Sequence, residues 1–253
     1  MISYSGGITS WGTAKLVIDT IAKPEDTVEL LFADTLIEDP DLHRFLDETS
    51  EKFGVPITKL CDGRTPWEVF RSEKFQGDSR IDPCSRHLKR KLLWKYIKDN
   101  YSPEEVVIYL GLDANEAHRL ERTRESRDAY TIRAPLVEND TFKESVFEWL
   151  KECNIEPPSL YGYGFSHNNC GGFCIKSGQG QFKLLMDHFP ERYEWHIAEQ
   201  EKTFKELGKR HPFIRKMING KVRYLSLADF RRRVKAGEEF DKFELGGCGC
   251  AID

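Results

Sequence analysis

The chain has 253 residues, of which 39% are hydrophobic and 32% charged, and its formal net charge is −4 at pH 7. That length can bury a sizeable core, either as one large domain or as one domain with a C-terminal extension. The absence of a secretory h-region and of any long apolar run argues against a membrane protein, so we expect a cytoplasmic protein whose seven cysteines do not form a disulfide framework.

The first ten residues predict a strand, a small-residue turn and the start of a helix. Residues 1–4 suit a strand, and apolar residues recur with helical spacing over residues 11–21. Between them, a glycine- and hydroxyl-rich turn presents backbone N–H groups and the positive end of the helix dipole to an anion. The spacing matches neither the Walker loop nor the dinucleotide turn. The residues expected to bind phosphate are Ser5, Gly6, Gly7, Thr9 and Ser10.

Further strand-like runs alternate with helical segments along the first half of the chain. The strands are expected at residues 27–33, 56–60 and 106–110, and helices at residues 40–53 and from Pro66 onward. This alternation predicts an α/β fold with a doubly wound, mainly parallel sheet and helices on both faces. Ligands bind such a sheet at the carboxyl ends of its strands. Asp34 and Asp113 fall on that rim.

The second half of the sequence is rich in helical patterns. A break near residues 138–143 separates a nucleotide-binding domain, residues 1–140, from an α-rich C-terminal region, residues 141–253. Helices are expected at residues 142–150, 181–189 and 192–207, followed by a short strand at 221–225 and a helix capped by Ser226.

Two cysteine pairs in glycine-rich surroundings are candidates for a metal centre. Cys170 and Cys174 form one pair, and Cys248 and Cys250 form the other. Four thiolates suit tetrahedral zinc or an iron–sulfur cluster, with His167 as an additional candidate ligand. Because the spacings differ from the usual C-x2-C zinc knuckle, both metals stay open. A redox-active dithiol and ordinary free thiols are the alternatives.

Cys84 precedes a basic helical segment and differs from these pairs. Arg86 and Lys89 at a helix N-terminus would lower the pKa of its thiol and favour thiolate chemistry, and the alternative is a small residue that lines a substrate pocket. Cys61 and Cys153 are expected in the core. The clusters of Lys and Arg at residues 86–98 and 209–223 suit either phosphate or nucleic-acid contact or a solvated helix face.

Four motifs in this order resemble the phosphoadenosine phosphosulfate (PAPS) reductase family. They are the SGGxxS loop from Ser5 to Ser10, the strand ending in Asp34-Thr35 with Glu38 downstream, Cys84 followed by Arg86 and Lys89, and the strand before Gly111 followed by Arg119, Arg122 and Pro135-Leu136. The first loop is also similar to that of the PP-loop ATP pyrophosphatases. The resemblance covers about residues 1–140 and implies the adenine nucleotide alpha hydrolase-like fold. Leu36 and Asp113 depart from the family, which usually has Gly and Arg there.

The resemblance implies an enzyme that binds ATP or a related adenine nucleotide through the Ser5–Ser10 loop and Gly111. Asp34 would hold Mg²⁺ or ribose, and Lys89 and Arg119 would neutralise developing phosphate charge. Adenylation of an acceptor would release pyrophosphate, and sulfur from a cysteine or a cluster would then displace AMP. Relatives that act in DNA phosphorothioation and transfer-RNA thiolation imply a nucleic-acid acceptor, with a sulfur-donor protein as a further partner.

Two other functions stay open at this point. In a genuine PAPS or APS reductase, a C-terminal cysteine would attack the sulfate sulfur and form a thiosulfonate before sulfite is released. The Cys-Gly-Cys tail with a second pair upstream favours a bound cluster over a free thiol. A non-catalytic nucleotide or nucleic-acid binder is the third hypothesis, because fold alone does not establish activity and the departures at Leu36 and Asp113 fall in the expected site.

Overall fold

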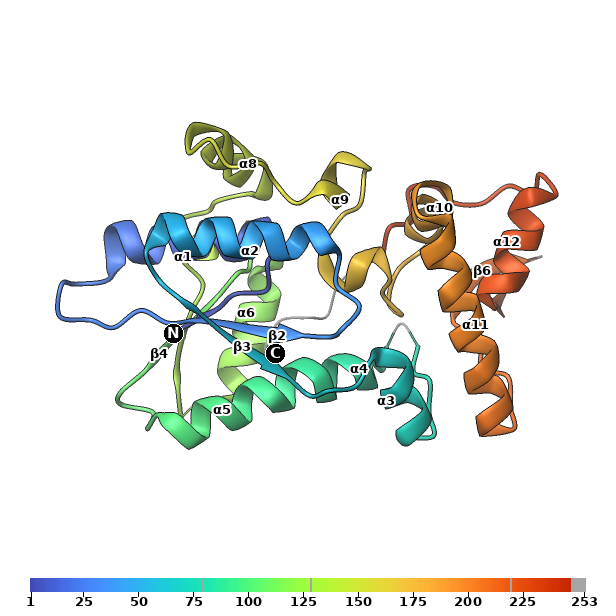
Figure 1. Ribbon diagram of the computed structural model, residues 1–253, viewed down its shortest axis with the longest axis horizontal. Coiled ribbons are helices and arrows are strands. Elements are labelled where there is room, and N and C mark those ends of the chain that lie inside the picture. Colours follow the sequence, from blue (N-terminus) through green and yellow to red (C-terminus); the bar gives the residue numbers. More distant parts are fainter. Residues whose placement is uncertain (79, 128, 219, 247–253) are drawn as a thin grey trace.

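Five parallel strands form the central sheet within the described residues, in the order β3-β2-β1-β4-β5 (Figure 1). The computed structural model describes residues 1–253 except 79, 128, 219 and 247–253. This sheet confirms the expected doubly wound α/β fold. The strand bounds are Ile2–Ser3 for β1, Leu30–Asp34 for β2, Ile57–Cys61 for β3, Val107–Leu110 for β4 and Thr131–Arg133 for β5.

The shortest strand, β1, lies at the centre of the sheet. Ile2 pairs with Leu30 of β2 on one side and with Tyr109 of β4 on the other. The neighbouring strand β2 reads LLFAD and its first four residues are buried, as expected for a parallel strand covered on both faces. Because the chain winds away from β1 in both directions, the crevice between the carboxyl ends of β1 and β4 is the topological switch point.

Helices cover both faces of the sheet and bury two separate cores (Figure 1). One core joins α1 and α2 to α8 and includes Trp11, Phe45 and Val146, so α8 packs on the nucleotide domain although it lies beyond residue 140. The other core lies beneath α5 and α6 and includes Trp94 and Leu120. The bounds are Ile8–Leu16 for α1, Pro40–Phe53 for α2, Leu92–Asn100 for α5, Ala117–Ser126 for α6 and Lys143–Glu152 for α8.

The C-terminal region is helix-rich, as expected, and packs around a third core. Trp67 and Phe70 of α3 contribute to this core together with Phe182, Tyr193 and Phe213. The region comprises α9 (Ser159–Gly162), α10 (Gln179–His188), α11 (Pro190–Leu207), the antiparallel hairpin β6 (Ile214–Ile218) and β7 (Lys221–Leu225), and α12 (Leu227–Lys235).

Short elements connect these layers. They are the π-helical turns η1 (Val17–Ile21) and η2 (Arg86–Lys91), the 3-10 turns η3 (Ala114–Glu116) and η4 (Asn169–Gly172), and the helices α3 (Pro66–Ser72), α4 (Pro83–Ser85) and α7 (Pro135–Glu138).

The last described residues fold back onto the segment that follows Cys174. Gly246 forms an antiparallel bridge with Ser177, and the Gly178 N–H donates to the Leu245 carbonyl at 3.1 Å. A Cβ on Gly178 would lie 2.0 Å from the Glu244 carbonyl oxygen, so only glycine permits this close contact. The chain therefore returns to the first cysteine pair, as a shared cysteine centre requires.

Some sequence expectations need correction. Helix α1 begins at Ile8 rather than Trp11, and strands β5 and β6 were not anticipated. The prediction that Cys61 lies in the core is wrong, because it ends the edge strand β3 and is exposed. Cys153 is only half-buried, against the first core. No helix among the described residues is both long and apolar enough to cross a membrane.

Candidate functional site

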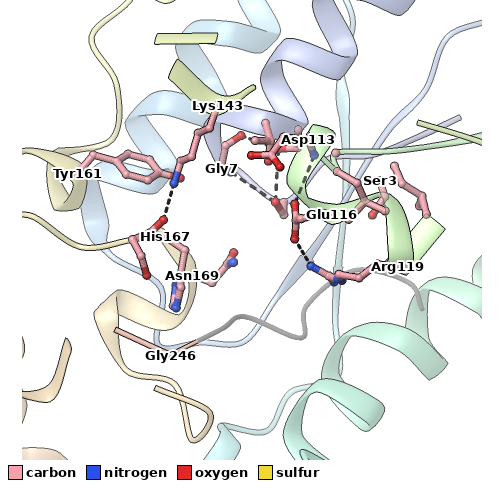
Figure 2. A pocket seen from close by; sticks show the side chains of 17 residues that line it. Ser3, Gly7, Asp113, Glu116, Arg119, Lys143, Tyr161, His167, Asn169 and Gly246 are labelled. Atoms are coloured by element: carbon pink, nitrogen blue, oxygen red, sulfur yellow. Dashed lines mark hydrogen bonds and ion pairs between the residues drawn. The ribbon is translucent and has the colours of Figure 1, made fainter. Parts of the chain in front are cut away.

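A pocket of about 250 Å³ lies at the carboxyl ends of β1 and β4, at the switch point of the sheet (Figure 2). Six of the residues expected to bind the nucleotide line it, and they come from the β1–α1 loop, the first turn of α1, the segment after β4 and helix α6. These are Ser5, Gly7, Thr9, Ser10, Gly111 and Arg119.

The two glycines of the β1–α1 loop have different roles. Gly6 has a φ of +76°, and a Cβ there would lie 2.9 Å from Leu42 Cγ, so both backbone conformation and space require glycine. Gly7 is the N-cap of α1 and has an extended backbone that any residue adopts. The N-cap residue of α1 makes no side-chain cap, and the Ile8 N–H donates to the Tyr161 hydroxyl at 3.4 Å. The next N–H groups of the first turn, on Thr9 and Ser10, can therefore bind an anion.

Gly111 brings the end of β4 against the first turn of α1. A Cβ on Gly111 would lie 2.6 Å from Ser10 Cα and 2.7 Å from Ser10 N. The glycine therefore permits a close approach of two backbones rather than an unusual backbone dihedral angle. This contact fixes the distance between the phosphate loop and the segment after β4.

The pocket wall after β4 carries both signs of charge. Arg119 forms an ion pair with Glu116, and Asp113 accepts a hydrogen bond from the Asn115 N–H at 2.9 Å as the cap of η3. Burial raises the pKa of the Asp113 carboxyl above its usual range, and the nearby Glu116 carboxylate raises it further. Figure 2 shows these side chains around the phosphate loop.

The sequence did not predict that residues of the C-terminal region, beyond residue 140, line part of the pocket. The Lys143 Nζ lies 4.6 Å from the centre of the Tyr161 ring and donates to the Ser166 carbonyl (Figure 2). The Tyr161 hydroxyl accepts a hydrogen bond from the Ile8 N–H at 3.4 Å. No motif marks these residues. The other late contributors to the wall are His167, Asn169 and Gly246, and the polar run before Cys170 was the available signal for the first two.

A second, much smaller cavity of about 20 Å³ is lined by Cys84, Cys170 and Cys174, and we call it the thiol cavity. It adjoins the nucleotide pocket, because Asn169 lines the pocket and the next residue lines the cavity. Cys84 therefore lies with the first cysteine pair and not among the residues that line the nucleotide pocket. Lys89 also lines the thiol cavity.

The Glu38 carboxylate contacts three residues that line the thiol cavity. Its side chain is only 1% exposed and accepts a hydrogen bond from Thr35 Oγ1 at 2.8 Å. It also accepts the Cys170 N–H and pairs with Lys89 Nζ at 3.4 Å. One carboxylate thus contacts the loop after β2, helix η2 and the loop that carries Cys170 and Cys174, which we call the cysteine loop.

The cysteine loop has an unusual backbone. Cys170, Gly171 and Gly172 all have positive φ, at 53°, 59° and 86°. A Cβ on Gly171 would lie 2.5 Å from the Ile37 carbonyl oxygen, so this loop packs tightly on the segment before Glu38. Arg192 of α11 donates to the Gly171 carbonyl at 2.6 Å and holds the loop from the other side. A left-handed cysteine is a strained conformation that needs such support.

The remaining expected site residues lie elsewhere or outside the described residues. The Asp34 carboxylate accepts a hydrogen bond from the Leu36 N–H at 2.7 Å and does not line the pocket, so its role with Mg²⁺ or ribose stays a prediction. Leu36 has a φ of +63°, which explains why glycine suits this position. Within the described residues, no three metal-binding side chains form a metal site, and Cys248 and Cys250 lie outside them.

One comparison with known proteins, a family model, shows the family of this chain. A family model described as phosphoadenosine phosphosulfate reductase domain matches residues 1–176, which include all five strands of the sheet and both cysteines of the first pair. The chain is also similar to the crystal structure of phosphoadenylyl-sulfate (PAPS) reductase from Candida auris in a phosphate complex. Identity is 16%, coverage is 65% of this chain and 78% of that chain, and the TM-score is 0.46. None of the curated proteins matches significantly.

The two loop glycines give a matched test of the phosphate site. Gly7→Val should lower nucleotide affinity at least about tenfold with little loss of stability, because its side chain would enter the pocket beside Tyr161 and Ser5. Gly6→Ala should instead cost about 1–2 kcal/mol of unfolding free energy, because it forces a left-handed alanine. Titration calorimetry and urea denaturation measure the two effects. Unchanged affinity in a folded Gly7→Val protein would remove the phosphate-loop assignment.

Removing the Glu38 carboxylate should destabilise the protein strongly. Glu38→Ala removes the buried carboxylate that pairs with Lys89 and accepts the Cys170 N–H, so we expect a loss of about 3–5 kcal/mol in urea denaturation. Glu48→Ala, at a surface ion pair of helix α2, is the control, and it should cost less than about 1 kcal/mol. Equal losses of unfolding free energy for the two variants would show that the buried Glu38 carboxylate contributes no more to stability than a surface carboxylate.

Proposed function

The chain belongs to the phosphoadenosine phosphosulfate reductase domain family, and we propose that it is an adenylating enzyme that binds ATP with Mg²⁺ and transfers sulfur. The observation that carries this proposal is the pair of carboxylates, Asp113 and Glu116, on the wall of a phosphate pocket. Carboxylates repel a bare anhydride, whereas Mg²⁺ in nucleotide sites is held by one or two carboxylates together with substrate phosphates.

The pocket's own residues suit the adenylation step. The N–H groups at the start of α1 would bind the phosphates, and Arg119 and Lys143 would stabilise the charge that develops on them. An acceptor oxygen would attack the α-phosphorus, and the bond to the leaving pyrophosphate would break. In a second step, the outer sulfur of a persulfide, loaded on one cysteine by a sulfur donor, would attack the acceptor atom that carries the adenylate, and AMP would leave with the bonding electron pair. A second cysteine thiolate would then attack the inner sulfur, which forms a protein disulfide and releases the thiolated acceptor.

The position of the tail supports sulfur chemistry at this pocket. Gly246 lines the nucleotide pocket and precedes Cys248 by two residues. Because an extended chain advances at most about 3.6 Å per residue, the pocket is within reach of a cysteine in that part of the sequence. This observation also favours a second candidate, a sulfonucleotide reductase. There a tail thiolate would attack the sulfate sulfur, the nucleotide phosphate would leave, and a further dithiol would release sulfite.

The cysteines around the thiol cavity are proposed to hold zinc or an iron–sulfur cluster together with the tail cysteines. Cys84, Cys170 and Cys174 line one cavity, and an all-sulfur donor set suits either group. The described residues alone do not form a metal site, so the proposal requires ligands from Cys248 or Cys250. Zinc would link the loop to the tail, and an iron–sulfur cluster would in addition supply electrons.

Replacing Asp113 separates the two candidate reactions. Asp113→Asn keeps a side chain that can cap η3 but removes a carboxylate. Mg²⁺-dependent ATP binding should weaken about tenfold in this variant if Asp113 holds the metal. Binding of a sulfonucleotide without a metal should instead tighten, because a negative charge is lost. Calorimetry with each nucleotide and assays for pyrophosphate and sulfite distinguish the two reactions. Tighter sulfonucleotide binding with sulfite release would overturn the adenylation proposal.

The same variant has an expected pH dependence of stability. Since the pKa of Asp113 is raised in the folded protein, ionising it there costs free energy, which begins to lower stability above about pH 4. Asp113→Asn should therefore unfold at a higher temperature than the parent protein at pH 7 and at about the same temperature near pH 3. A melting-temperature difference that does not change with pH would contradict this explanation.

Metal content tests the proposed role of Cys84. Cys84→Ser should reduce the bound zinc or iron at least by half after anaerobic purification, measured by elemental analysis and absorption spectroscopy. Cys61→Ser is the matched control, because Cys61 is exposed at the sheet edge. Equal metal content in the two variants would exclude Cys84 from the centre.

A further inference from the structure

A groove of about 630 Å³ on the outer side of helices η2 and α5 is lined almost entirely by cations. Asp99 is the one acidic residue among the described residues that line it. We call it the basic groove. Its lining residues are Arg86, Arg90, Lys91, Trp94, Lys95, Lys98, Asp99 and Arg127.

The basic groove and the thiol cavity are lined by different residues of one helical segment. Ser85 and Lys89, four residues apart, line the thiol cavity, whereas Arg86 and Arg90, also four residues apart, line the basic groove. Arg90 links the two, because it donates to Asp82 at 2.8 Å and to Ser85 at 3.3 Å, and both acceptors line the thiol cavity.

Among the described residues, only two of the six cations of the basic groove form ion pairs. Arg90 pairs with Asp82, and Lys95 pairs with Asp99 four residues later. In the part of the chain that the structure describes, the remaining four cations have no acidic partner within ion-pair distance. They are Arg86, Lys91, Lys98 and Arg127.

Arg127 is held in position to receive an anion. Its guanidinium lies 4.8 Å from the centre of the buried Trp94 ring, which in turn packs edge-on against Tyr130. Its Nη1 donates to the Ser126 carbonyl at 3.0 Å, and its buried Nε has no hydrogen-bond partner among the described residues. A stacked guanidinium with donors to spare is a phosphate-binding arrangement.

We propose that the basic groove binds the sugar–phosphate backbone of a nucleic acid. The thirteen residues from Arg86 to Lys98 span roughly 18 Å of helix, which corresponds to about five phosphates along one strand of a duplex. An acidic protein is disfavoured, because protein interfaces have an apolar centre and Trp94 is buried beneath Arg127. A single nucleotide would contact only part of this row of charges.

A nucleic acid bound in the basic groove would be the acceptor of the proposed reaction. The binding itself does not depend on that reaction, whereas the use of the bound strand as acceptor rests on the proposed function. A strand in the basic groove would lie one helix away from the cysteines of the thiol cavity. Contacts to phosphates carry no sequence information, so binding here should not depend on base sequence.

The test is fluorescence anisotropy of the full chain with labelled 20-nucleotide single-stranded RNA, single-stranded DNA and duplex DNA. Four cations without acidic partners predict a slope of about −3 to −4 in log K against log salt. Affinity should then fall about 60- to 250-fold between 50 and 200 mM salt. The three probes identify the preferred strand, and absence of binding to all of them overturns the proposal.

Variants locate the binding to the basic groove. Lys91→Ala combined with Lys98→Ala should reduce the slope by about 2 and weaken binding at least tenfold at 50 mM salt. Lys202→Ala combined with Lys205→Ala, on the exposed side of α11, is the matched control and should change neither. Equal effects of the two pairs, or equal binding of poly-glutamate, would overturn the proposal.

Calorimetry with ATP on the same proteins separates this inference from the proposed function. Both double variants should bind ATP as the parent protein does, because none of the four lysines lines the nucleotide pocket. Strand binding without ATP binding would overturn the proposed function and leave the basic groove standing. ATP binding with no strand binding would overturn the basic groove alone.

Discussion

The buried contact of Glu38 with Lys89 and the Cys170 N–H is the constraint on which both cavities depend. A buried ion pair contributes little net stability, because the cost of desolvating two charges offsets their attraction. The main effect of this ion pair is on the relative positions of the segments that it joins. It fixes the loop after β2, helix η2 and a cysteine loop with left-handed backbone to one another, although these segments are separated in sequence by about fifty and eighty residues. The cysteine loop that is fixed in this way contributes Asn169 to the nucleotide pocket and Cys170 to the thiol cavity.

The sequence predicted the parts of the site that are local. The Ser5–Ser10 loop could be recognised because a strand, a glycine-bearing turn and a helix N-terminus form one contiguous anion site. Gly111 was expected as a ligand-binding residue, and its physical role is to allow β4 to approach Ser10. Strand β5 was missed because it is only three residues long and reads TIR, with no apolar run.

The residues that the sequence could not place depend on tertiary packing. Lys143 and Tyr161 belong to no motif, and they reach the pocket only because α8 packs against α1 and α9 follows it. Cys84 was expected as a reactive thiolate or as a small residue of a substrate pocket, yet the direction in which α4 faces decides its surroundings, and it lines the thiol cavity with Cys170. A one-dimensional pattern shows that a residue begins a helix, but not which neighbouring cavity that side of the helix will line.

The bridge between Ser177 and Gly246 makes chain length a determinant of function. The contact is made mainly by backbone groups around Gly178 and Gly180, together with a hydrogen bond from Gln179 Nε2 to the Glu244 carboxylate at 3.0 Å. The number of residues between α12 and the bridge is not free to vary, because one inserted residue would shift the register and turn each following side chain to the opposite side. The length of this segment therefore sets the register of the bridge, and an insertion or deletion in it should disturb the site more than a substitution does.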